Sequence, residues 1–544
     1  MFDTVLIANR GEIACRVIRT CRRLGIRAVA VYSDADAAAL HVAQADEAHR
    51  IGPAPARRSY LDIEAILAAA KAAGAEAIHP GYGFLAENAE FAEACAGAGV
   101  AFVGPPAEAI RALGAKDAAK KVMDEAGVPV VPGYHGGAQD LETLRGAALE
   151  LGFPVLVKPV AGGGGLGMRV AAKAKDLADA VAASRREAAS AFGDDRVLIE
   201  KHLSRPRHVE VQIFADGSGQ TLHLFERDCS IQRRYQKVME EAPAPGLEAD
   251  LRARLGEAAV AAARAIGYVG AGTVEFLLDR KGGFYFLEMN TRLQVEHPVT
   301  EMVTGQDLVE WQLEVAAGAA LPLAQEAIAL SGHAIEARLY AEDPERDFLP
   351  ASGRIARLRL PREDGHVRID TGVREGDAVA VHYDPMIAKL IVWDRDRAGA
   401  VRRLRTALGE VQVLGVATNA AFLASLAAQP AFEAGEVDTG FVSRHRKALL
   451  PARRAASERV LALAALAVLC ERADAARAAA ARSNDPYSPW HRTDGWQLND
   501  DNRQEVAFRD GETIEEVTVR ARGDGYLLQL RNTSLQARAE RDAS

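Results

Sequence analysis

The sequence predicts an α/β fold that opens with a doubly wound parallel sheet and ends in a helix followed by antiparallel strands. Three observations lead to this prediction. Short apolar strands alternate with amphipathic helices over residues 1–115, strand and helix patterns continue to about residue 446, and an Ala- and Arg-rich helical stretch begins near residue 449. Alternating strands and helices are typical of a parallel sheet covered by helices.

The individual elements follow from apolar periodicity. In the first region we expect strands Thr4–Ala8, Ala28–Tyr32, Ala77–His79 and Ala101–Val103, and a helix over Glu12–Leu24. Further along we expect strands Val155–Lys158, Val209–Phe214, Thr273–Leu278, Phe284–Met289 and His333–Ala341, and helices Asp250–Ile266 and Ala400–Leu408. The tail should hold a helix ending near Arg482 and strands Glu515–Val519 and Gly525–Leu530.

These elements group into four expected regions. They are an N-terminal α/β domain (1–115), a central region (116–330) with a mobile glycine-rich lid (about 131–203), an α+β domain (331–446), and a helical linker with a partial β domain (447–544). Asn9-Arg10-Gly11 follows the first strand, and the G-x-G-x-x-G fingerprint of dinucleotide-binding proteins is absent there.

Composition excludes several classes of protein. A formal net charge of −9 argues against binding nucleic acid through bulk charge. The five cysteines form no CxxC pair, which predicts a reduced intracellular protein without structural zinc. The N-terminus becomes charged too early for a signal peptide, and no apolar run reaches the roughly 18 residues of a membrane span. We therefore expect a cytoplasmic protein, bacterial by composition, without nucleic-acid or membrane partners.

A hairpin carries the first chemical signal. If Lys281-Gly282 is a two-residue turn between Thr273–Leu278 and Phe284–Met289, Glu275 lies opposite Glu288. Opposed carboxylates repel, so a positive group should hold them. A hard divalent cation such as Mg²⁺ prefers such oxygen ligands.

The residues after this hairpin alternate in polarity. Every second side chain of an extended strand shares a face, and that face would carry Glu288, Asn290, Arg292, Gln294 and Glu296. Fully extended, the stretch would cover roughly 26 Å at about 3.3 Å per residue, enough for a metal at one end and a small anion at the other. The alternative is a solvated strand face without a ligand.

Glycines and cations provide weaker signals. The run Gly162–Gly165 follows Lys158, and successive backbone N–H groups without side chains can wrap a phosphate, although a plain linker is the alternative. Asp228–Lys237 is rich in cationic and amide groups, with an exposed basic turn as its alternative. His333–Ala341 places Glu336 and Arg338 on one face, which a structural ion pair would also explain.

Six motifs together resemble one family. They are Ile7–Ala14 (IANRGEIA), His79–Leu85 (HPGYGFL), Gly162–Gly167 (GGGGLG), Pro206–Glu210 (PRHVE), Glu288–Pro298 (EMNTRLQVEHP) and Tyr383–Met386 (YDPM). Residues 1–446 resemble biotin carboxylase. The resemblance implies the ATP-grasp fold and the cofactors ATP, Mg²⁺ or Mn²⁺, and biotin. It also implies that bicarbonate attacks the ATP γ-phosphate to give carboxyphosphate, whose breakdown releases CO₂ and a phosphate that deprotonates biotin N1′.

The resemblance also implies roles for matching positions. ATP would be held by Lys116, Lys158, Gly164, Gly165, Met168, Glu200, Lys201, Leu203, His208, Gln232, Tyr235 and Leu277. Glu275, Glu288 and Asn290 would hold the metal, and Lys237, Arg292, Gln294 and Val295 would hold bicarbonate. Glu296 would be the general base and Arg338 would steady the biotin enolate, completing a catalytic set with Lys237 and Arg292.

Three positions depart from the family pattern. Leu166 stands where the glycine-rich loop usually has Arg or Lys, Tyr235 replaces a usual His, and Pro159 follows Lys158 where a small residue is usual. All three lie on the expected nucleotide side. We therefore expect weaker ATP binding with less effect on turnover.

The tail narrows the family. Asp485–Trp490 and Asp494–Trp496 resemble the α subunits of 3-methylcrotonyl-CoA carboxylases, enzymes of leucine degradation. Such a subunit works with a carboxyltransferase β subunit and a biotin carrier domain, in a large α6β6-type complex. The carrier's Ala-Met-Lys-Met motif is absent, since the last methionine is Met386, so the carrier is expected outside this chain.

Several alternatives remain open at this point. The acyl-CoA partner reaction could be that of a propionyl-CoA or geranyl-CoA carboxylase. Another ATP-grasp ligase, forming carbamoyl phosphate or ligating amino acids, is the next alternative. A non-catalytic nucleotide-binding scaffold is disfavoured by Glu275, Glu288, Arg292 and Glu296, and a stand-alone biotin carboxylase by the residues beyond 446.

Overall fold

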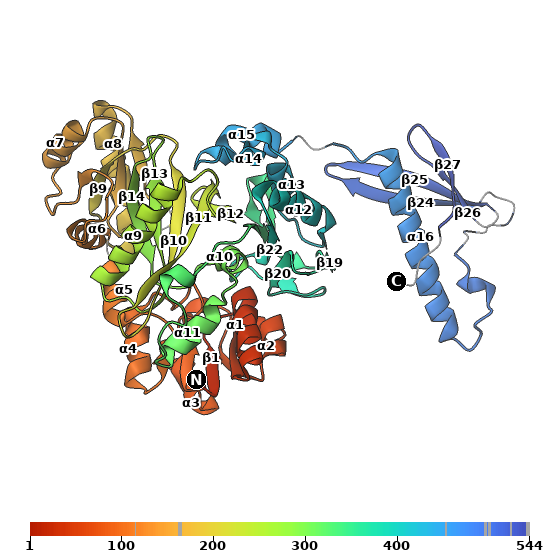
Figure 1. Ribbon diagram of the computed structural model, residues 1–544. Helices are drawn as coiled ribbons and strands as arrows, with labels where there is room; N and C mark the ends of the chain where they lie inside the picture. Colours follow the sequence, from red (N-terminus) through yellow and green to blue (C-terminus); the bar gives the residue numbers. More distant parts are fainter. Residues whose placement is uncertain are drawn as a thin grey trace. The chain divides into compact units, whose positions relative to one another are not determined.

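The computed structural model describes residues 1–114, 116–161, 166–451, 454–493, 495, 498, 502–522 and 525–539, except the side chains of Lys116 and Phe192. The chain forms two compact units, Met1–Leu450 and Pro451–Ser544. Helices and strands are mixed throughout the larger unit, which confirms the α/β class (Figure 1).

The chain begins with a parallel five-stranded sheet in the order β3-β2-β1-β4-β5. Its strands are β1 (Thr4–Ile7), β2 (Arg27–Ser33), β3 (Glu47–Gly52), β4 (Ala77–His79) and β5 (Ala101–Phe102). The predicted parallel sheet is confirmed, and β3, whose polar residues hide its strand character, was not predicted. Its helices are α1 (Gly11–Leu24), α2 (Leu40–Gln44), α3 (Ile63–Ala73), α4 (Ala89–Gly97) and α5 (Ala107–Leu113).

The order of this sheet reverses between β1 and β4. Loops after two such strands diverge at the carboxyl edge and leave a crevice, which is where ligands bind in open α/β sheets. Here the loops begin at Ala8 and Pro80, and Asn9 Nδ2 ties them together by donating to Pro80 O at 2.7 Å and Tyr82 O at 2.8 Å. The sheet therefore presents Asn9, Arg10 and Tyr82 along one edge.

A second, antiparallel sheet of eight strands forms the centre, in the order β14-β13-β10-β11-β12-β15-β22-β20. The strands are β10 (Arg207–Ala215), β11 (Thr221–Arg233), β12 (Gln236–Ala242), β13 (Gly270–Leu278), β14 (Phe284–Asn290), β15 (His333–Tyr340), β20 (Val367–Thr371) and β22 (Met386–Asp394). Strands β12 and β15 pair directly, so this sheet is continuous between the second and third expected regions.

Helices cover this sheet. Helix α9 (Ala249–Ala265) buries Leu255 and Ala259 against β10, and α12 (Arg397–Glu410) packs Val401 and Leu404 on Ile335. Helix α10 (His297–Thr304) lies on the other face of β15, where Val299 meets Ala334. Apart from the two helices of the lid region, the remaining α-helices described in this unit are α6 (Lys116–Glu125), α11 (Leu308–Ala316), α13 (Ala420–Ala427), α14 (Pro430–Glu433) and α15 (Phe441–Leu449).

The predicted lid region forms its own small sheet, β6-β9-β7-β8, with two helices. Its elements are β6 (Gly133–Tyr134), α7 (Leu141–Leu151), β7 (Val155–Pro159), β8 (Arg169–Ala171), α8 (Leu177–Phe192) and β9 (Val197–Lys201). Leu144, Val157, Val181 and Ile199 belong to a core that this region keeps to itself. A separate core is what a segment that moves as a body requires.

The smaller unit pairs one long helix with a four-stranded antiparallel sheet. Ser457 caps α16 (Glu458–Ala481) by accepting from Val460 N, and Leu461, Ala465 and Leu469 bury against Val517 and Val519. The strands are β24 (Arg503–Asp510), β25 (Thr513–Arg522), β26 (Gly525–Gln529) and β27 (Ser534–Ala537). The helix and strands predicted for the tail are confirmed, while Asp494 and Trp496 of its second motif lie outside the described residues.

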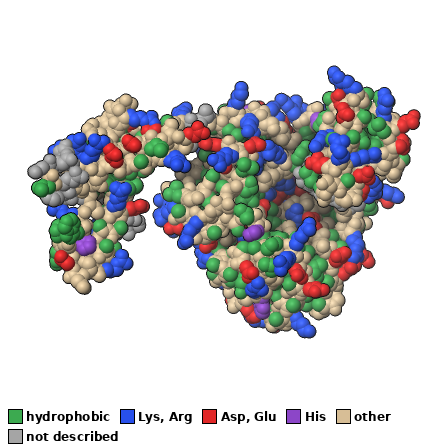
Figure 2. Space-filling view, turned by 180° about the vertical axis from the view of Figure 1, so that it is seen from behind, with side chains coloured by type: hydrophobic (Ala, Val, Ile, Leu, Met, Phe, Trp, Pro, Cys, Tyr) green, Lys and Arg blue, Asp and Glu red, His purple; other side chains and the backbone are tan. Residues whose placement is uncertain are grey.

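Three expectations from composition can be compared with the structure. On the face seen in Figure 2, basic and acidic side chains are interspersed instead of forming one basic patch. All five cysteines are free thiols. No helix in the described ranges is long and apolar enough to cross a membrane.

Candidate active site

One cavity of about 1130 Å³ collects the predicted site residues of the larger unit. Its lining includes Lys158, Met168, Glu200, Lys201, Leu203, His208, Gln232, Tyr235, Lys237, Glu275, Leu277, Glu288, Asn290, Arg292, Gln294, Val295, Glu296 and Arg338. Three predicted residues cannot be placed in it, because Gly164, Gly165 and the side chain of Lys116 lie outside the described residues. Residues spread over 180 positions of sequence thus share one site.

The hairpin places Glu275 opposite Glu288 as predicted, but through a different turn and a bulge. The expected two-residue turn is wrong: Asp279 N donates to Gly283 O at 2.8 Å, which leaves a three-residue loop with Gly282 at φ +82°. A left-handed third residue is usual in such loops. A bulge after Phe286 adds one residue and restores the predicted pairing at Glu288.

The stretch after the hairpin is less extended than predicted. Strand β14 ends at Asn290, and Glu296 is already the N-cap of α10. The chain folds back, because Asn290 Nδ2 and Gln294 Nε2 both donate to Glu275 Oε1, at 2.7 and 3.0 Å. The metal-type and anion-type groups are therefore neighbours, not separate ends of a roughly 26 Å strand.

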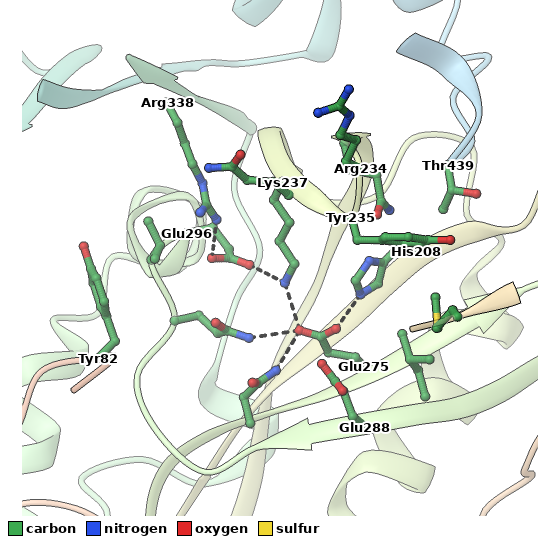
Figure 3. A pocket seen from close by; sticks show the side chains of 18 of the residues that line it. Tyr82, His208, Arg234, Tyr235, Lys237, Glu275, Glu288, Glu296, Arg338 and Thr439 are labelled. Carbon is green, nitrogen blue, oxygen red and sulfur yellow. Dashed lines mark hydrogen bonds and ion pairs between the residues drawn. The ribbon is translucent and has the colours of Figure 1, made fainter. Parts of the chain in front are cut away.

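Glu275 lies at the centre of the cluster, with Glu288 beside it (Figure 3). Its Oε2 meets His208 Nε2 at 2.7 Å, and its Oε1 meets Lys237 Nζ at 2.9 Å. Burial favours the neutral acid, but Lys237 and His208 outweigh it and hold the pKa of Glu275 well below its usual range. Glu275 thus has two cationic partners among the described residues, His208 and Lys237.

Glu296 connects two cations. Its Oε1 accepts from Lys237 Nζ at 2.6 Å and its Oε2 from Arg338 Nη2 at 2.9 Å. Although burial raises the pKa of a carboxyl, Lys237, Arg338 and Arg227 keep the pKa of Glu296 well below its usual value. The carboxylate is therefore ionised and able to accept a proton.

Arg292 lines the same cavity and is held by one carboxylate and two side-chain amide oxygens. Its Nη1 donates to Gln294 Oε1 at 2.7 Å, its Nη2 to Asn290 Oδ1 at 3.1 Å and its Nε to Glu87 Oε2 at 3.0 Å. Lys389 Nζ donates to Val295 O at 2.8 Å and fixes the backbone between Gln294 and Glu296. A small anion placed here would meet Lys237, Arg292 and the Gln294 amide.

The other end of the cavity belongs to the lid. Lys158 Nζ lies 2.5 Å from Glu200 Oε2, and Lys120 of α6 pairs with the same carboxylate. The wall continues through Leu203 to Thr439, whose N–H donates to Pro206 O at 3.0 Å. This end thus combines the basic groups of Lys158 and Lys201 with apolar residues such as Leu203 and the buried carboxylate of Glu200.

The three unusual residues occupy different positions. Tyr235 lines the cavity in a left-handed conformation at φ +68°, and Pro159 Cγ is close enough to Gly167 that a Cβ there would lie only 2.7 Å away. Leu166 is 45% exposed and is not among the cavity-lining residues. Pro159 is thus accommodated by a glycine, whereas Leu166 contributes no polar contact.

Sequence reasoning missed several lining residues. Asn9, Arg10, Tyr82, Tyr383 and Asp384 lie in motifs that carried the resemblance but received no role, although the place of the first three after β1 and β4 was a usable signal. Lys120 follows Lys116 by one helical turn. Thr439, Gly440 and Ser443 gave no signal, because only the folded chain brings them to Pro206.

Family models match four stretches of the chain. They are the biotin carboxylase N-terminal domain (1–110), the ATP-binding domain of the carbamoyl-phosphate synthase L chain (115–324), the biotin carboxylase C-terminal domain (336–444) and the BT domain of the methylcrotonyl-CoA carboxylase α subunit (457–544).

Individual relatives agree with these matches. The mitochondrial methylcrotonoyl-CoA carboxylase subunit alpha of Dictyostelium discoideum is 53% identical over 521 residues, covering 96% of this chain and 74% of that protein. The biotin carboxylase of Halalkalibacterium halodurans is 52% identical, covering 82% of this chain and 98% of that protein. The biotin carboxylase domain of Hydrogenobacter thermophilus 2-oxoglutarate carboxylase, solved with MgADP, ADP and bicarbonate, superposes with a TM-score of 0.80 at 45% identity, covering 83% of this chain and 100% of that one.

The fold and cavity are those of an ATP-dependent biotin carboxylase with the ATP-grasp fold. Such an enzyme catalyses the biotin-carboxylating half-reaction of an acyl-CoA carboxylase. Within that class, the chain belongs to the α subunits of methylcrotonoyl-CoA carboxylase, as the BT domain and the relatives above 50% identity show. Membership implies a carboxyltransferase β subunit and a biotin carrier as partners.

Proposed function

We propose that this chain carboxylates biotin for the carboxylation of 3-methylcrotonyl-CoA, with the site residues acting as follows. The observation that carries the proposal is Glu296, an ionised buried carboxylate shared by Lys237 and Arg338 within reach of Glu275. Lys237, Arg292, Gln294 and the backbone of Val295 bind bicarbonate.

Glu296 acts as the base for bicarbonate. Its three cationic neighbours outweigh the effect of burial and set its pKa low, which keeps it deprotonated but makes it a weak base. A bound bicarbonate draws Lys237 toward itself and adds negative charge beside Glu296, and both effects raise the pKa of the carboxyl. Proton transfer to Glu296 is thereby coupled to binding of the correct anion.

The metal ligands fit a hard divalent cation. Glu275, Glu288 and the Asn290 amide oxygen provide only oxygen donors, and two opposed carboxylates require compensating charge. Mg²⁺ or Mn²⁺ held there would neutralise the phosphates of ATP. Lys116, Lys158, Gly164, Gly165, Met168, Glu200, Lys201, Leu203, His208, Gln232, Tyr235 and Leu277 would hold the nucleotide.

The wider assignments are part of the same proposal. We assign residues 1–115, 116–330 with its lid, and 331–446 to the carboxylase, and 447–544 to docking of the carboxyltransferase β subunit. The assembly is α6β6, and the protein works in the bacterial cytoplasm in leucine degradation. Arg338 steadies the enolate of the biotin ring.

Biotin-dependent ATP hydrolysis tests the reaction. Purified chain should form ADP from MgATP and bicarbonate faster when free biotin is added, and carbamoyl-phosphate-forming or amino-acid-ligating enzymes should not respond to biotin. Supplied with a biotinylated carrier and the co-purifying β subunit, it should carboxylate 3-methylcrotonyl-CoA in preference to propionyl-CoA and geranyl-CoA. Preference for either of the latter would correct the acyl-CoA assignment while leaving the biotin carboxylase reaction in place.

Replacing Leu166 by Arg should strengthen ATP binding. The exposed lid residue offers no polar contact, and an arginine would add a solvent-exposed ion pair with a phosphate, worth about 1 kcal/mol. We expect the KM for ATP to fall about threefold to tenfold with kcat changed less than twofold. Leu149→Arg, at a lid position that is 57% exposed on α7, is the matched control and should leave the KM unchanged. An unchanged KM in Leu166→Arg would refute the lid explanation.

A further inference from the structure

A pair of buried carboxylates lies behind Arg338, and neither has a role so far. Glu240 of β12 and Glu336 of β15 are directly opposed across the antiparallel ladder. Glu336 and Arg338 share a face of β15, and Glu240 is the diagonal neighbour of Arg338 on that face. Helix α10, which Glu296 caps, covers the same face. The pair therefore lies between the sheet and the helix that carries the proposed base.

The two carboxylates differ in their partners. Glu240 is 1% exposed, and its Oε1 lies 2.6 Å from Arg338 Nη2. Glu336 is fully buried, and by strict geometry none of the described residues donates a hydrogen bond to an oxygen of either carboxylate, so the ion-pair contact of Glu240 with Arg338, which Glu336 lacks within the described residues, is what separates the two. Leaving two ionised oxygens buried without donors would cost several kcal/mol, far more than burying a neutral acid. Glu240 is thus suited to the charged form and Glu336 to the neutral form.

The surrounding charges lead to the same assignment. Arg338, Lys389, Lys237 and Glu296 are the charged groups that act on the pair. Lys389 is already occupied by Val295 O at 2.8 Å, Glu12 at 3.2 Å and Asp370 at 3.7 Å. Burial raises the pKa of Glu240 to about 7 against the opposing pull of Arg338, and burial raises the pKa of Glu336 well above its usual value. When the two carboxyl groups hold a single proton, Glu336 is therefore the one that carries it.

Two carboxylates hold Arg338, and only one of them takes part in proton transfer. Its Nη2 contacts Glu240 Oε1 at 2.6 Å and Glu296 Oε2 at 2.9 Å, while its Nε has no acceptor within the part of the chain that the structure describes. When Glu296 takes a proton from bicarbonate, it loses its charge and most of its attraction for the guanidinium. Glu240 does not take part in that transfer, so its contact persists.

We propose that Glu240 is a positioning residue that keeps Arg338 directed into the cavity while Glu296 is protonated, and that Glu336 is the neutral member of the pair. The inference rests on the proposed role of Arg338 in the biotin half of the reaction. It assigns Glu240 to the carboxylation of biotin alone, because the activation of bicarbonate uses Lys237, Arg292 and Glu296 directly. Because Glu336 is neutral, it does not compete with Glu240 for the positive charge of Arg338.

Two activities of the full chain test this proposal: bicarbonate-dependent ADP formation without biotin, and the additional ADP formation with free biotin. Glu240→Gln should lower the second about 30-fold, the effect of one lost charge-assisted bond, and change the first less than threefold. Glu336→Gln, which mimics a neutral acid, should change both less than threefold. Equal losses in Glu240→Gln and Glu336→Gln would overturn the division of charge, and equal losses of both activities in Glu240→Gln would overturn the positioning role.

A double-mutant cycle separates this inference from the role of Arg338. In an Arg338→Gln background, adding Glu240→Gln should lower the biotin-dependent rate by less than about threefold, because the group it positions is gone. No loss in Arg338→Gln alone would refute the proposed role of Arg338, whereas a loss there and none in Glu240→Gln would refute only the present inference. MgADP binding, measured by calorimetry, verifies that each variant is folded. If Glu240→Gln does not fold, Glu240→Asp takes its place, because it keeps the negative charge but moves it away from Arg338. Glu240→Asp should lower only the biotin-dependent activity. Glu314→Gln, remote on α11, is the control for both activities.

Discussion

Replacing Glu296 by Gln will lower biotin- and bicarbonate-dependent turnover about 10³-fold, within the range that loss of a general base produces. Glutamine keeps the shape of the side chain and can still accept from Lys237 or Arg338, but it cannot take a proton. The variant should fold, because Lys237 retains Glu210 and Glu275, and Arg338 retains Glu240. The KM for ATP should change little, since none of the described lid residues is bonded to Glu296.

The measurement is ADP formation with and without bicarbonate and biotin, together with MgADP binding by calorimetry. Glu257→Gln, at an exposed position on α9, is the matched control and should retain full turnover. If Glu296→Gln kept more than a tenth of the parental rate with both substrates, another group would have to serve as the base. A loss of MgADP binding would instead indicate that the carboxylate is structural.

The central carboxylates could be predicted from sequence because their relationship is local. Glu275 and Glu288 belong to one hairpin, and a period of two within 20 residues fixes which side chains meet. The predicted turn was wrong by one residue, and a bulge compensated for it. Alternation also placed Arg292, Gln294 and Glu296 on one side, although the chain stops being a strand at Asn290. The side of the chain toward which each side chain points was thus easier to predict than the path of the backbone.

What holds these residues could not be predicted from local patterns. Lys237 joins Glu210, Glu275 and Glu296, three residues from separate strands and a helix cap that meet only in the folded sheet. Glu240 meets Glu336 across nearly a hundred residues of sequence because β12 pairs with β15. Pairing between strands that are distant in sequence depends on the whole sheet, so periodicity within one strand says nothing about it.

Arg227 is the clearest of these hidden supports, and replacing it by Met should cost about 3–5 kcal/mol of unfolding free energy in the larger unit. Its side chain is fully buried beneath the cluster. Nε donates to Glu210 Oε1 at 2.6 Å, Nη1 to Gln212 Oε1 at 2.8 Å and Thr300 Oγ1 at 2.9 Å, and Nη2 to Thr273 Oγ1 at 3.2 Å. Methionine fills similar volume but donates nothing, which leaves Glu210 buried with Lys237 as its remaining cation.

Urea unfolding followed by fluorescence and near-ultraviolet circular dichroism should reveal this loss as a lower midpoint for the larger unit. Arg186→Met, at an exposed position on α8, removes the same charge without removing a buried partner and should stay within about 0.5 kcal/mol of the parent. Because Glu210 also accepts from Lys237, the Arg227 variant should draw Lys237 away from Glu296 and lower turnover as well. A variant as stable as the parent would mean that the ion pair contributes no more than an apolar replacement, as happens where attraction only offsets desolvation. Loss of turnover without loss of stability would then place Arg227 in the electrostatics of the site and not in the support of the sheet.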